Sequence, residues 1–343
     1  MSTLSELELR LYIPPQSQTS LSNAVNQLPG HLIHLQAKYF DTPERDLAKR
    51  SIAIRIRRED QQWVQTLKAP GSHAIEQLEL NHPLNTPELD LELYKNQPIY
   101  DLLKPLQATL QIRFETDVQR RIAYLQTHTG LVELAHDTGF IRAGAHQTSI
   151  SEVEFELKEG DISAVLDSGL QWLTQHQLAL EFRSKAERGD RLARSSSHSQ
   201  EVTTRVSKGT SDTRTPSHTP PHKQALQIIE QLARSSLQQI QSDDPKALYP
   251  HTPEIEQQLI RLQTLLANTK DLSAVTNQSD QALIERVLKQ LEQLKESDTH
   301  QTNTADTHST HNMQSLVVST EFQGWMLSLF ARLLTQHAGS NLS

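Results

Sequence analysis

The chain of 343 residues contains no cysteine. Disulfide bonds, thiolate metal sites and a cysteine nucleophile are therefore excluded. None of its 11 glycines belongs to a glycine-rich phosphate-binding loop, which excludes a P-loop mechanism. Long apolar runs are missing too, and the opening residues, MSTLSELELRLYI, lack the basic start of a signal peptide. We therefore expect a cytoplasmic protein that has no contact with a membrane.

Acidic residues outnumber basic ones, 41 against 33, and the formal net charge is -8. Because proteins that bind nucleic acids generally carry a net basic face, this charge argues against a nucleic-acid partner. A basic pocket inside an acidic protein remains compatible with it.

The composition divides the chain into three parts. Residues 1–194 combine many strand-like segments with few helical ones, which predicts an α+β domain built on a closed or nearly closed barrel. Residues 195–222 are rich in Ser, Thr, His and Pro and predict a flexible linker. Residues 223–343 predict an all-α region with helices over 223–241, 253–268, 280–295 and 313–336.

Within the first part, alternation and turn residues predict both element types. The expected strands are residues 4–13, 37–40, 51–58, 63–68, 75–80, 114–125, 131–137, 139–143 and 150–158. The expected helices are residues 20–27, 91–97 and 162–175.

Several of these strands carry all their charged residues on one face. Glu6, Glu8 and Arg10 alternate with leucines, and Glu152, Glu154, Glu156 and Lys158 alternate with Val153, Phe155 and Leu157. A sheet with one solvated face produces the same pattern. If the charged faces instead line a barrel lumen, the mixture of Arg, Lys and paired Glu suits an anionic ligand bridged by divalent cations. Alternation alone leaves both interpretations open.

Eight segments in order resemble one known family. They are ELELR at 6–10, YFDTP at 39–43, IRIRRE at 54–59, WVQTLK at 63–68, FET at 114–116 followed by Arg120, VELA at 132–135 followed by Asp137, EVEFELK at 152–158 and RSKAERG at 183–189. Together they are similar to the CYTH domains of bacterial inorganic triphosphatases, also called triphosphate tunnel metalloenzymes. The resemblance implies an eight-stranded antiparallel β-tunnel with two openings.

The resemblance also implies roles for individual residues. Glu6, Glu8 and Arg10 would form the catalytic group, in which Glu6 and Glu8 would hold the metal that assists attack of water. Glu152, Glu154 and Glu156 would hold a metal that orients the triphosphate. Phosphate oxygens would be bound by Arg55, Arg57, Lys68, Arg120 and Lys185. Glu133 and Asp137 would be further tunnel acids, and a looser match adds Glu79.

One position departs from the family pattern, because the signature lysine is Arg10 here. Arginine keeps the positive charge but replaces a compact ammonium with a planar fork. The substitution predicts altered substrate binding.

The helical part is similar at its opening, residues 225–237 and 244–248, to the CHAD domains that bind polyphosphate. The similarity then ends, since residues 253–261 have a single arginine among acids. We expect a degenerate or truncated CHAD-like region. Its last apolar helix, with Phe322, Trp325, Phe330 and Leu333, is the predicted surface for self-association.

The expected activity is hydrolysis of inorganic triphosphate, or a related polyphosphate, to pyrophosphate and phosphate with Mg²⁺ or Mn²⁺. The alternatives are hydrolysis of an organic triphosphate, such as thiamine triphosphate or a nucleotide, adenylyl cyclisation, and triphosphate or polyphosphate binding with little turnover.

Overall fold

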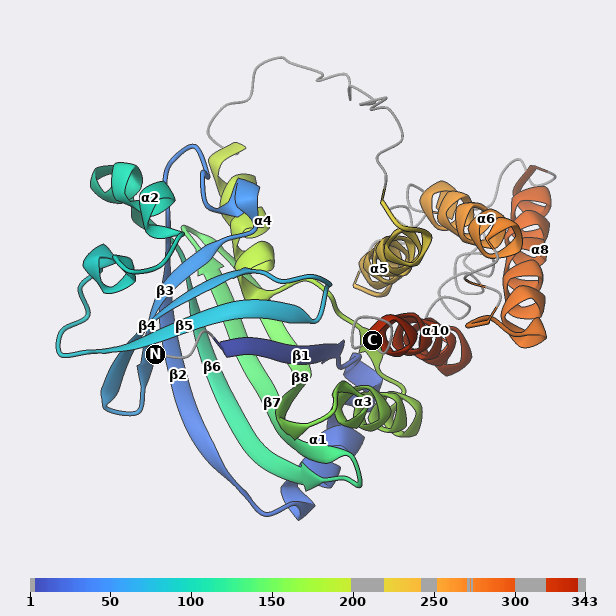
Figure 1. Ribbon diagram of the computed structural model, residues 1–343, viewed down its shortest axis with the longest axis horizontal. Coiled ribbons are helices and arrows are strands. Elements are labelled where there is room, and N and C mark those ends of the chain that lie inside the picture. Colours follow the sequence, from blue (N-terminus) through green and yellow to red (C-terminus); the bar gives the residue numbers. More distant parts are fainter. Residues whose placement is uncertain are drawn as a thin grey trace. The chain divides into compact units, whose positions relative to one another are not determined.

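The computed structural model describes residues 4–198, 219–241, 252–269, 272, 274–299 and 319–338 (Figure 1). These residues divide between two compact units. The first comprises residues 1–10, 22–160 and 183–209, and the second comprises residues 11–21, 161–182 and 210–343. The domain boundaries at 194 and 222 remain a prediction, because the compact units alternate along the chain.

The first unit is built on a closed antiparallel sheet. Its strands are β1 (Leu4–Tyr12), β2 (Gly30–Asp41), β3 (Ala53–Glu59), β4 (Gln62–Pro70), β5 (Glu76–Leu84), β6 (Gln111–Gln126), β7 (Gly130–Ala143) and β8 (His146–Gly160). They follow the order β5-β4-β3-β2-β6-β7-β8-β1, and pairing of β5 with β1 closes the ring. The predicted eight-stranded antiparallel tunnel, followed by a helical region, is confirmed. A two-residue strand, β9 (Ala179–Leu180), pairs with the end of β1.

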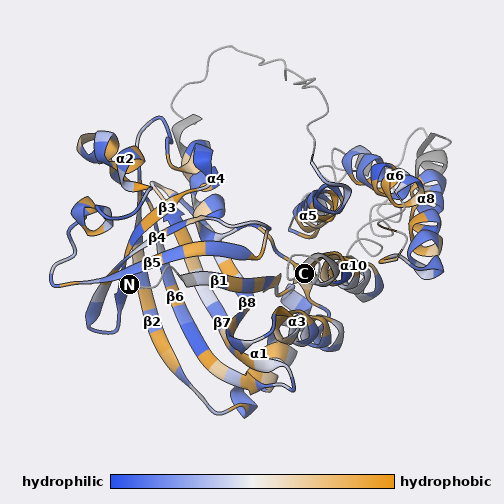
Figure 2. Ribbon diagram, in the orientation of Figure 1, coloured by the Kyte–Doolittle hydropathy of each residue, from blue (hydrophilic) through white to orange (hydrophobic). Residues whose placement is uncertain are grey.

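The alternation along the strands sets which side chains face the lumen, and Figure 2 shows hydrophilic and hydrophobic residues alternating along them. The β7–β8 register pairs Glu133 with Glu156 and Asp137 with Glu152, so these acids share one face of the sheet. The opposite faces of β3 and β4 carry Ile54 and Leu67. These two are fully buried in a core with the turns η3 (Leu91–Tyr94) and α2 (Tyr100–Leu103). Of the two interpretations of the charged faces, the structure supports the lumen.

Helix α4 (Lys185–His198) packs against β6, β7 and β8. Its Ala186, Leu192 and Ala193 join an apolar cluster with side chains such as Phe114 and Ile141 of those strands. The sequence predicted no helix here. The helix continues to His198 and so includes the first residues of the linker predicted at 195–222. Residues 199–218 of that predicted linker lie outside the described residues.

Three local expectations are wrong in detail. The segments 131–137 and 139–143 form the single strand β7, because Gly139 has extended backbone and continues it. The strand expected at 37–40 is twelve residues long, Gly30–Asp41. The helix expected at 91–97 is a short 3-10 turn, Leu91–Tyr94. The helices expected at 20–27 and 162–175 are present as α1 (Gln18–Gln27) and α3 (Ile162–His176).

The second unit contains α3, β9 and the C-terminal helices α5 (Pro221–Ile240), α6 (Thr252–Asn268), α8 (Gln278–Thr299) and α10 (Thr320–Ala338). Helix α10 packs on α3 and α5. Its Gln323 side chain accepts a hydrogen bond from the Leu180 backbone N–H at 3.0 Å, and the Phe330 ring lies 5.2 Å from that of Phe182.

The apolar face of α10 is therefore buried inside its own chain. Phe322, Phe330 and Leu333 are at most 1% exposed. Self-association through these helices stays a prediction. Among the described helices, none is both long and apolar enough to span a membrane.

Candidate active site

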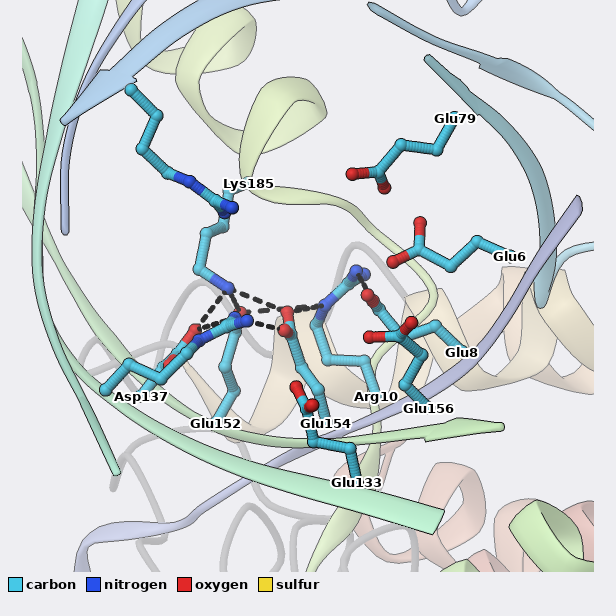
Figure 3. A network of polar contacts seen from close by, with 12 residues as sticks. Glu6, Glu8, Arg10, Glu79, Glu133, Asp137, Glu152, Glu154, Glu156 and Lys185 are labelled. Atoms are coloured by element: carbon cyan, nitrogen blue, oxygen red, sulfur yellow. Dashed lines mark hydrogen bonds and ion pairs between the residues drawn. The ribbon is translucent and has the colours of Figure 1, made fainter. Parts of the chain in front are cut away.

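Three buried carboxylates converge in the lumen of the tunnel (Figure 3). Asp137 comes from β7, and Glu152 and Glu154 come from β8. One oxygen of each lies within 4.8 Å of the others, and their side chains are between 0% and 6% exposed. We call these three residues the acidic triad. Two of its members were predicted as metal ligands and the third as a tunnel acid.

Four cations surround the acidic triad. Arg120 donates two hydrogen bonds to Asp137, at 2.7 and 2.6 Å, and also contacts Glu154. Lys185 contacts all three carboxylates, at 2.7 Å from Asp137 and Glu154. The Arg10 Nε atom donates to Glu154 at 3.0 Å. The fourth cation is Arg188, which contacts Glu152.

The electrostatics of this group follow from burial and pairing. Burial by itself raises the pKa of a carboxyl group and lowers that of an ammonium group. Here the close opposite charges outweigh burial. Lys185 and Arg120 hold the pKa of Glu154 well below its usual range, and the three carboxylates raise the pKa of Lys185. Glu154 and Lys185 are therefore both ionised at neutral pH.

Arg188 is the residue of this site that the sequence analysis did not assign. It follows Lys185 by three positions in the first turn of α4, and this spacing places both side chains on the same side of a helix. Its Nε atom is buried with no hydrogen-bond partner among the described residues. Had residues 185–198 been recognised as helical, that spacing would have indicated Arg188.

A second group lies between β1, β4 and β5. The Lys68 Nζ atom is 2.6 Å from a carboxylate oxygen of Glu6 and 2.6 Å from one of Glu79. Burial raises the pKa of Glu6 to about 9, although Lys68 opposes the shift, and the hydrogen bond between Glu6 and Glu79 adds to it. One proton is thus shared by this carboxyl pair at neutral pH.

Glu8 and Arg10 connect β1 to the acidic triad. The Arg10 guanidinium contacts Glu8 on its own strand, Glu154 on β8 and the Arg183 carbonyl oxygen at 3.1 Å. A planar fork reaches several acceptors at once, which the family lysine cannot do with the same geometry. Glu8 and Arg10 therefore belong to the contacts around the acidic triad, whereas Glu6, the third residue of the predicted catalytic group, pairs with Lys68.

The remaining predicted phosphate ligands lie on β3. Arg55 donates to the Tyr39 hydroxyl at 3.3 Å, and its buried Nε atom has no hydrogen-bond partner in the described part of the chain. Arg57 pairs with Glu59. Burial disfavours ionisation of Tyr39, but Arg55 and the other nearby cations outweigh it and lower the pKa of this phenol. Both arginines therefore contribute positive charge to the lumen.

The acids Glu133 and Glu156 lie apart from the acidic triad. Lys158 pairs with both of them, at 3.3 and 2.7 Å, and the Tyr124 hydroxyl donates to Glu133 at 3.0 Å. Burial raises the pKa of Glu156. The structure does not bring Glu156 together with Glu152 and Glu154 in one group of contacts, although all three share a face of β8.

The acidic triad suits a hard divalent cation. Mg²⁺ and Mn²⁺ prefer carboxylate oxygens, and three oxygens this close provide them without thiolate or imidazole. The other predicted ligands, Glu6 and Glu8, lie on the same strand, with Lys68 and Arg10 respectively as their closest cations. Their role as metal ligands stays a prediction.

Comparison with known proteins places these residues in a family. The CYTH domain model matches residues 4–189. An inorganic triphosphatase from Haemophilus influenzae is 32% identical over 192 residues, which are 54% of this chain and 54% of that protein. The chain thus spans about half the length of this curated relative.

Solved structures resemble the tunnel at lower identity. A Bacillus halodurans protein named as an adenylate cyclase is 21% identical, with a TM-score of 0.40 over 53% of this chain and 96% of its own. A Hippeastrum protein, whose description names a dominant triphosphatase activity, is 18% identical, with a TM-score of 0.42 over 56% of this chain and 96% of its own.

The comparisons do not confirm the CHAD-like character expected for the helical region. The predicted CYTH resemblance, by contrast, is confirmed by a match that covers more than half of the chain and all of the tunnel strands β1–β8. The chain belongs to the CYTH domain family.

Proposed function

We propose that the tunnel hydrolyses inorganic triphosphate to pyrophosphate and phosphate, with Mg²⁺ or Mn²⁺ as cofactor. The observation that carries the proposal is the acidic triad with its four cations, buried in the lumen of a closed sheet. Few ligands use both charge types at once. A triphosphate needs cationic side chains for its oxygens, and the carboxylates of the acidic triad would hold a metal that supplies further positive charge.

The residues would divide the work by their chemistry. Arg120, Lys185 and Arg188, with Arg55 and Arg57 on β3, would bind and orient the phosphate oxygens. Phosphoryl transfer requires such positioning and charge neutralisation more than covalent participation by the protein. The bound metal would neutralise the charge that develops on the triphosphate and assist attack of water.

Glu6 would serve proton movement at the opposite side of the lumen. Its carboxyl group keeps a proton near neutral pH, shared with Glu79, and lies 2.6 Å from Lys68. A carboxyl with such a raised pKa can exchange a proton during the reaction. The similarity to the Haemophilus influenzae inorganic triphosphatase supports the inorganic substrate over an organic one.

A binding module with little turnover is the second candidate. The observation that favours it is Arg10, whose fork ties Glu8 and Glu154 together with the Arg183 carbonyl. If this tie holds both carboxylates away from a metal, binding of triphosphate would persist without efficient hydrolysis.

The deciding experiment measures phosphate release from inorganic triphosphate, thiamine triphosphate and ATP, each with Mg²⁺, Mn²⁺ or chelator. It uses the full chain, because α10 packs on α3 and bonds to β9. Metal-dependent release that is fastest with inorganic triphosphate supports the proposal. Release that is fastest with an organic triphosphate assigns that substrate, and tight triphosphate binding without release supports the binding module.

A substitution separates hydrolysis from binding. Glu6→Gln should abolish turnover and spare much of the triphosphate affinity, because the glutamine cannot exchange a proton. Arg57→Glu should weaken triphosphate affinity, because it reverses a charge in the lumen. Equal loss of rate and affinity in Glu6→Gln would contradict the assigned role of Glu6.

A further inference from the structure

We infer that Lys185 and Arg188 keep the metal site at the acidic triad closed, and that a triphosphate opens it by drawing these two cations onto its own oxygens. The inference rests on the proposed function and adds a regulation of the same site. Metal and triphosphate would then assist one another's binding through the protein.

The carboxylate oxygens of the acidic triad are already occupied by cations of the protein. Each of the six oxygens of the acidic triad accepts a contact from a cationic side chain. In Glu152, one oxygen contacts Lys185 and the other contacts Arg188. A divalent cation placed among these oxygens would meet like charges within contact distance, and the interior of the protein screens that repulsion poorly.

The four cations of the group differ in how they are held. Arg10 is held by Glu8 and by the Arg183 carbonyl, and Arg120 forms a two-pronged bond with Asp137. Lys185 and Arg188 instead reach the triad from the first turn of α4 on long, rotatable side chains. They are the members of the group that an incoming anion can redirect with a change of rotamer.

An anionic ligand competes with the acidic triad for these cations. Four cations face the three carboxylates of the acidic triad, and one of them, Arg10, also pairs with Glu8, so before any ligand binds each cation is paired with carboxylates of the protein. Arg188 also has an unused buried Nε donor. A triphosphate offers several anionic oxygens, which guanidinium and ammonium groups bind strongly. The redirected cations leave carboxylate oxygens that a metal can use.

Thermodynamic linkage makes the effect reciprocal. If the anion raises the metal affinity of the site by some factor, the metal raises the anion affinity by the same factor. Metal ions also bind triphosphate in plain water, so a test with both ligands together would mix the two effects. The decisive measurement therefore uses the metal alone.

The experiment titrates the full chain with Mn²⁺ in the absence of any phosphate and counts free Mn²⁺ by electron paramagnetic resonance. Arg188→Gln and Lys185→Gln each remove one of the closing cations. We expect each variant to bind Mn²⁺ roughly tenfold more tightly than the unaltered chain, a typical size for coupling between sites. Their affinity for the non-hydrolysable imidotriphosphate, measured with chelator present, should fall.

The matched control is Arg142→Gln, which removes the same charge from an exposed side chain on the outer face of β7. Its Mn²⁺ affinity should equal that of the unaltered chain. A second variant, Arg188→Lys, keeps the charge and should also remain close to the unaltered chain. Thermal unfolding curves identify any variant that has lost its fold. If one of the two glutamine variants is unfolded, the Mn²⁺ affinity of the other one tests the inference.

Unchanged or weaker Mn²⁺ binding in folded Arg188→Gln and Lys185→Gln would overturn the inference. The outcome is separate from that of the proposed function. A chain that hydrolyses nothing but binds Mn²⁺ more tightly after Arg188→Gln would refute the proposed function alone. A chain that hydrolyses triphosphate without the gain in Mn²⁺ affinity would refute the closed metal site alone.

Discussion

The lumen-facing side chains of strand β7 change character along its length. Glu133 and Asp137 are charged, whereas Ile141 and Ala143, on the same face, are apolar and at most 2% exposed. Strand β8 shows the same change in reverse, from Ile150 to Glu152 and Glu154. The lumen-facing residues of this tunnel are thus not polar throughout. Along each strand, their polarity matches that of the groups that fill the lumen at the same position.

The lumen thus has an apolar region, around Phe114, Ile141 and Ala143, and a charged region, around the acidic triad. Different groups fill the two regions. In the apolar region α4 packs against the wall, and the Phe114 ring stacks on that of Tyr39 with 4.5 Å between centroids. In the charged region the side chains pair with one another around the acidic triad. We therefore expect substitutions in the charged region to change chemistry, and those in the apolar region to change stability.

The largest expected effect is on turnover in the charged region. Glu154→Gln removes the carboxylate that contacts Arg10, Arg120 and Lys185, so the positive charges lose a shared partner. Phosphate release should fall about a hundredfold to a thousandfold, as with loss of other groups that stabilise transition-state charge. The control Glu115→Gln, an exposed position on β6, should keep its rate. Full activity of Glu154→Gln would contradict a role of the acidic triad in hydrolysis.

Phe114→Ala should give the largest loss of stability in the apolar region. The ring is 6% exposed and packs against both Tyr39 and α4. Truncation of a buried phenylalanine costs about 3–5 kcal/mol of unfolding free energy. Urea denaturation measures the change, and Phe140→Ala, at a ring 41% exposed, is the matched control. Equal losses in the two variants would show that α4 does not make this region a core.

A smaller effect tests how closely α4 approaches the wall. A Cβ atom added at Gly189 would lie 2.2 Å from the Phe114 ring. Gly189→Ala should cost about 1–3 kcal/mol through overpacking, even though alanine favours a helix. The control Gly324→Ala in α10 would meet no atom closer than 3.8 Å and should be neutral or stabilising. A stabilised Gly189→Ala would mean that the helix sits farther from the ring.

The smallest effect concerns a carboxylate at the start of β5, outside both regions. Hydrogen bonds from Ser72, and a further one from Ser5 at 2.7 Å, lower the pKa of Glu76 from 4.5 to about 2. Since the folded state lowers this pKa, Glu76 stabilises the protein above pH 4.5, and this stabilisation is lost as pH falls toward 2.

Glu76→Gln should therefore be slightly less stable than the unaltered chain at pH 7, and the difference should shrink below pH 4.5. The effect is small because solvent screens a group this exposed. Urea midpoints at several pH values measure the difference. The companion variant Ser72→Ala removes the Ser72 hydroxyl donor and keeps the Ser72 backbone N–H donor. A difference that does not vary with pH would contradict the lowered pKa.

The sequence indicated most of the charged region, and for a definite physical reason. Strand alternation has a period of two, so Glu152, Glu154 and Glu156 had to share a face whatever the fold. The eight motifs in order then predicted the tunnel fold. Residues as distant in the chain as Arg10, Arg120 and Lys185 do meet at the acidic triad.

The apolar region and the partition of the acids were not predictable in the same way. Residues 185–198 mix charged and small residues, and their helix forms an apolar contact only because Gly189 and Ala193 meet the side chains of the wall. Likewise, alternation places Glu156 on the same face as Glu154 but does not reveal that Lys158 pairs with both Glu156 and Glu133. Arg188 was missed because its significance depends on the start of that helix.

By itself, the sequence determined which charged residues share a strand face, because alternation has a period of two, and its ordered motifs indicated the closed antiparallel sheet. Only the tertiary structure decided which charges pair, where α4 makes the lumen apolar, and that α10 packs on α3. These features depend on contacts between residues far apart in the chain, and such contacts arise from packing and charge compensation in three dimensions rather than from any local pattern.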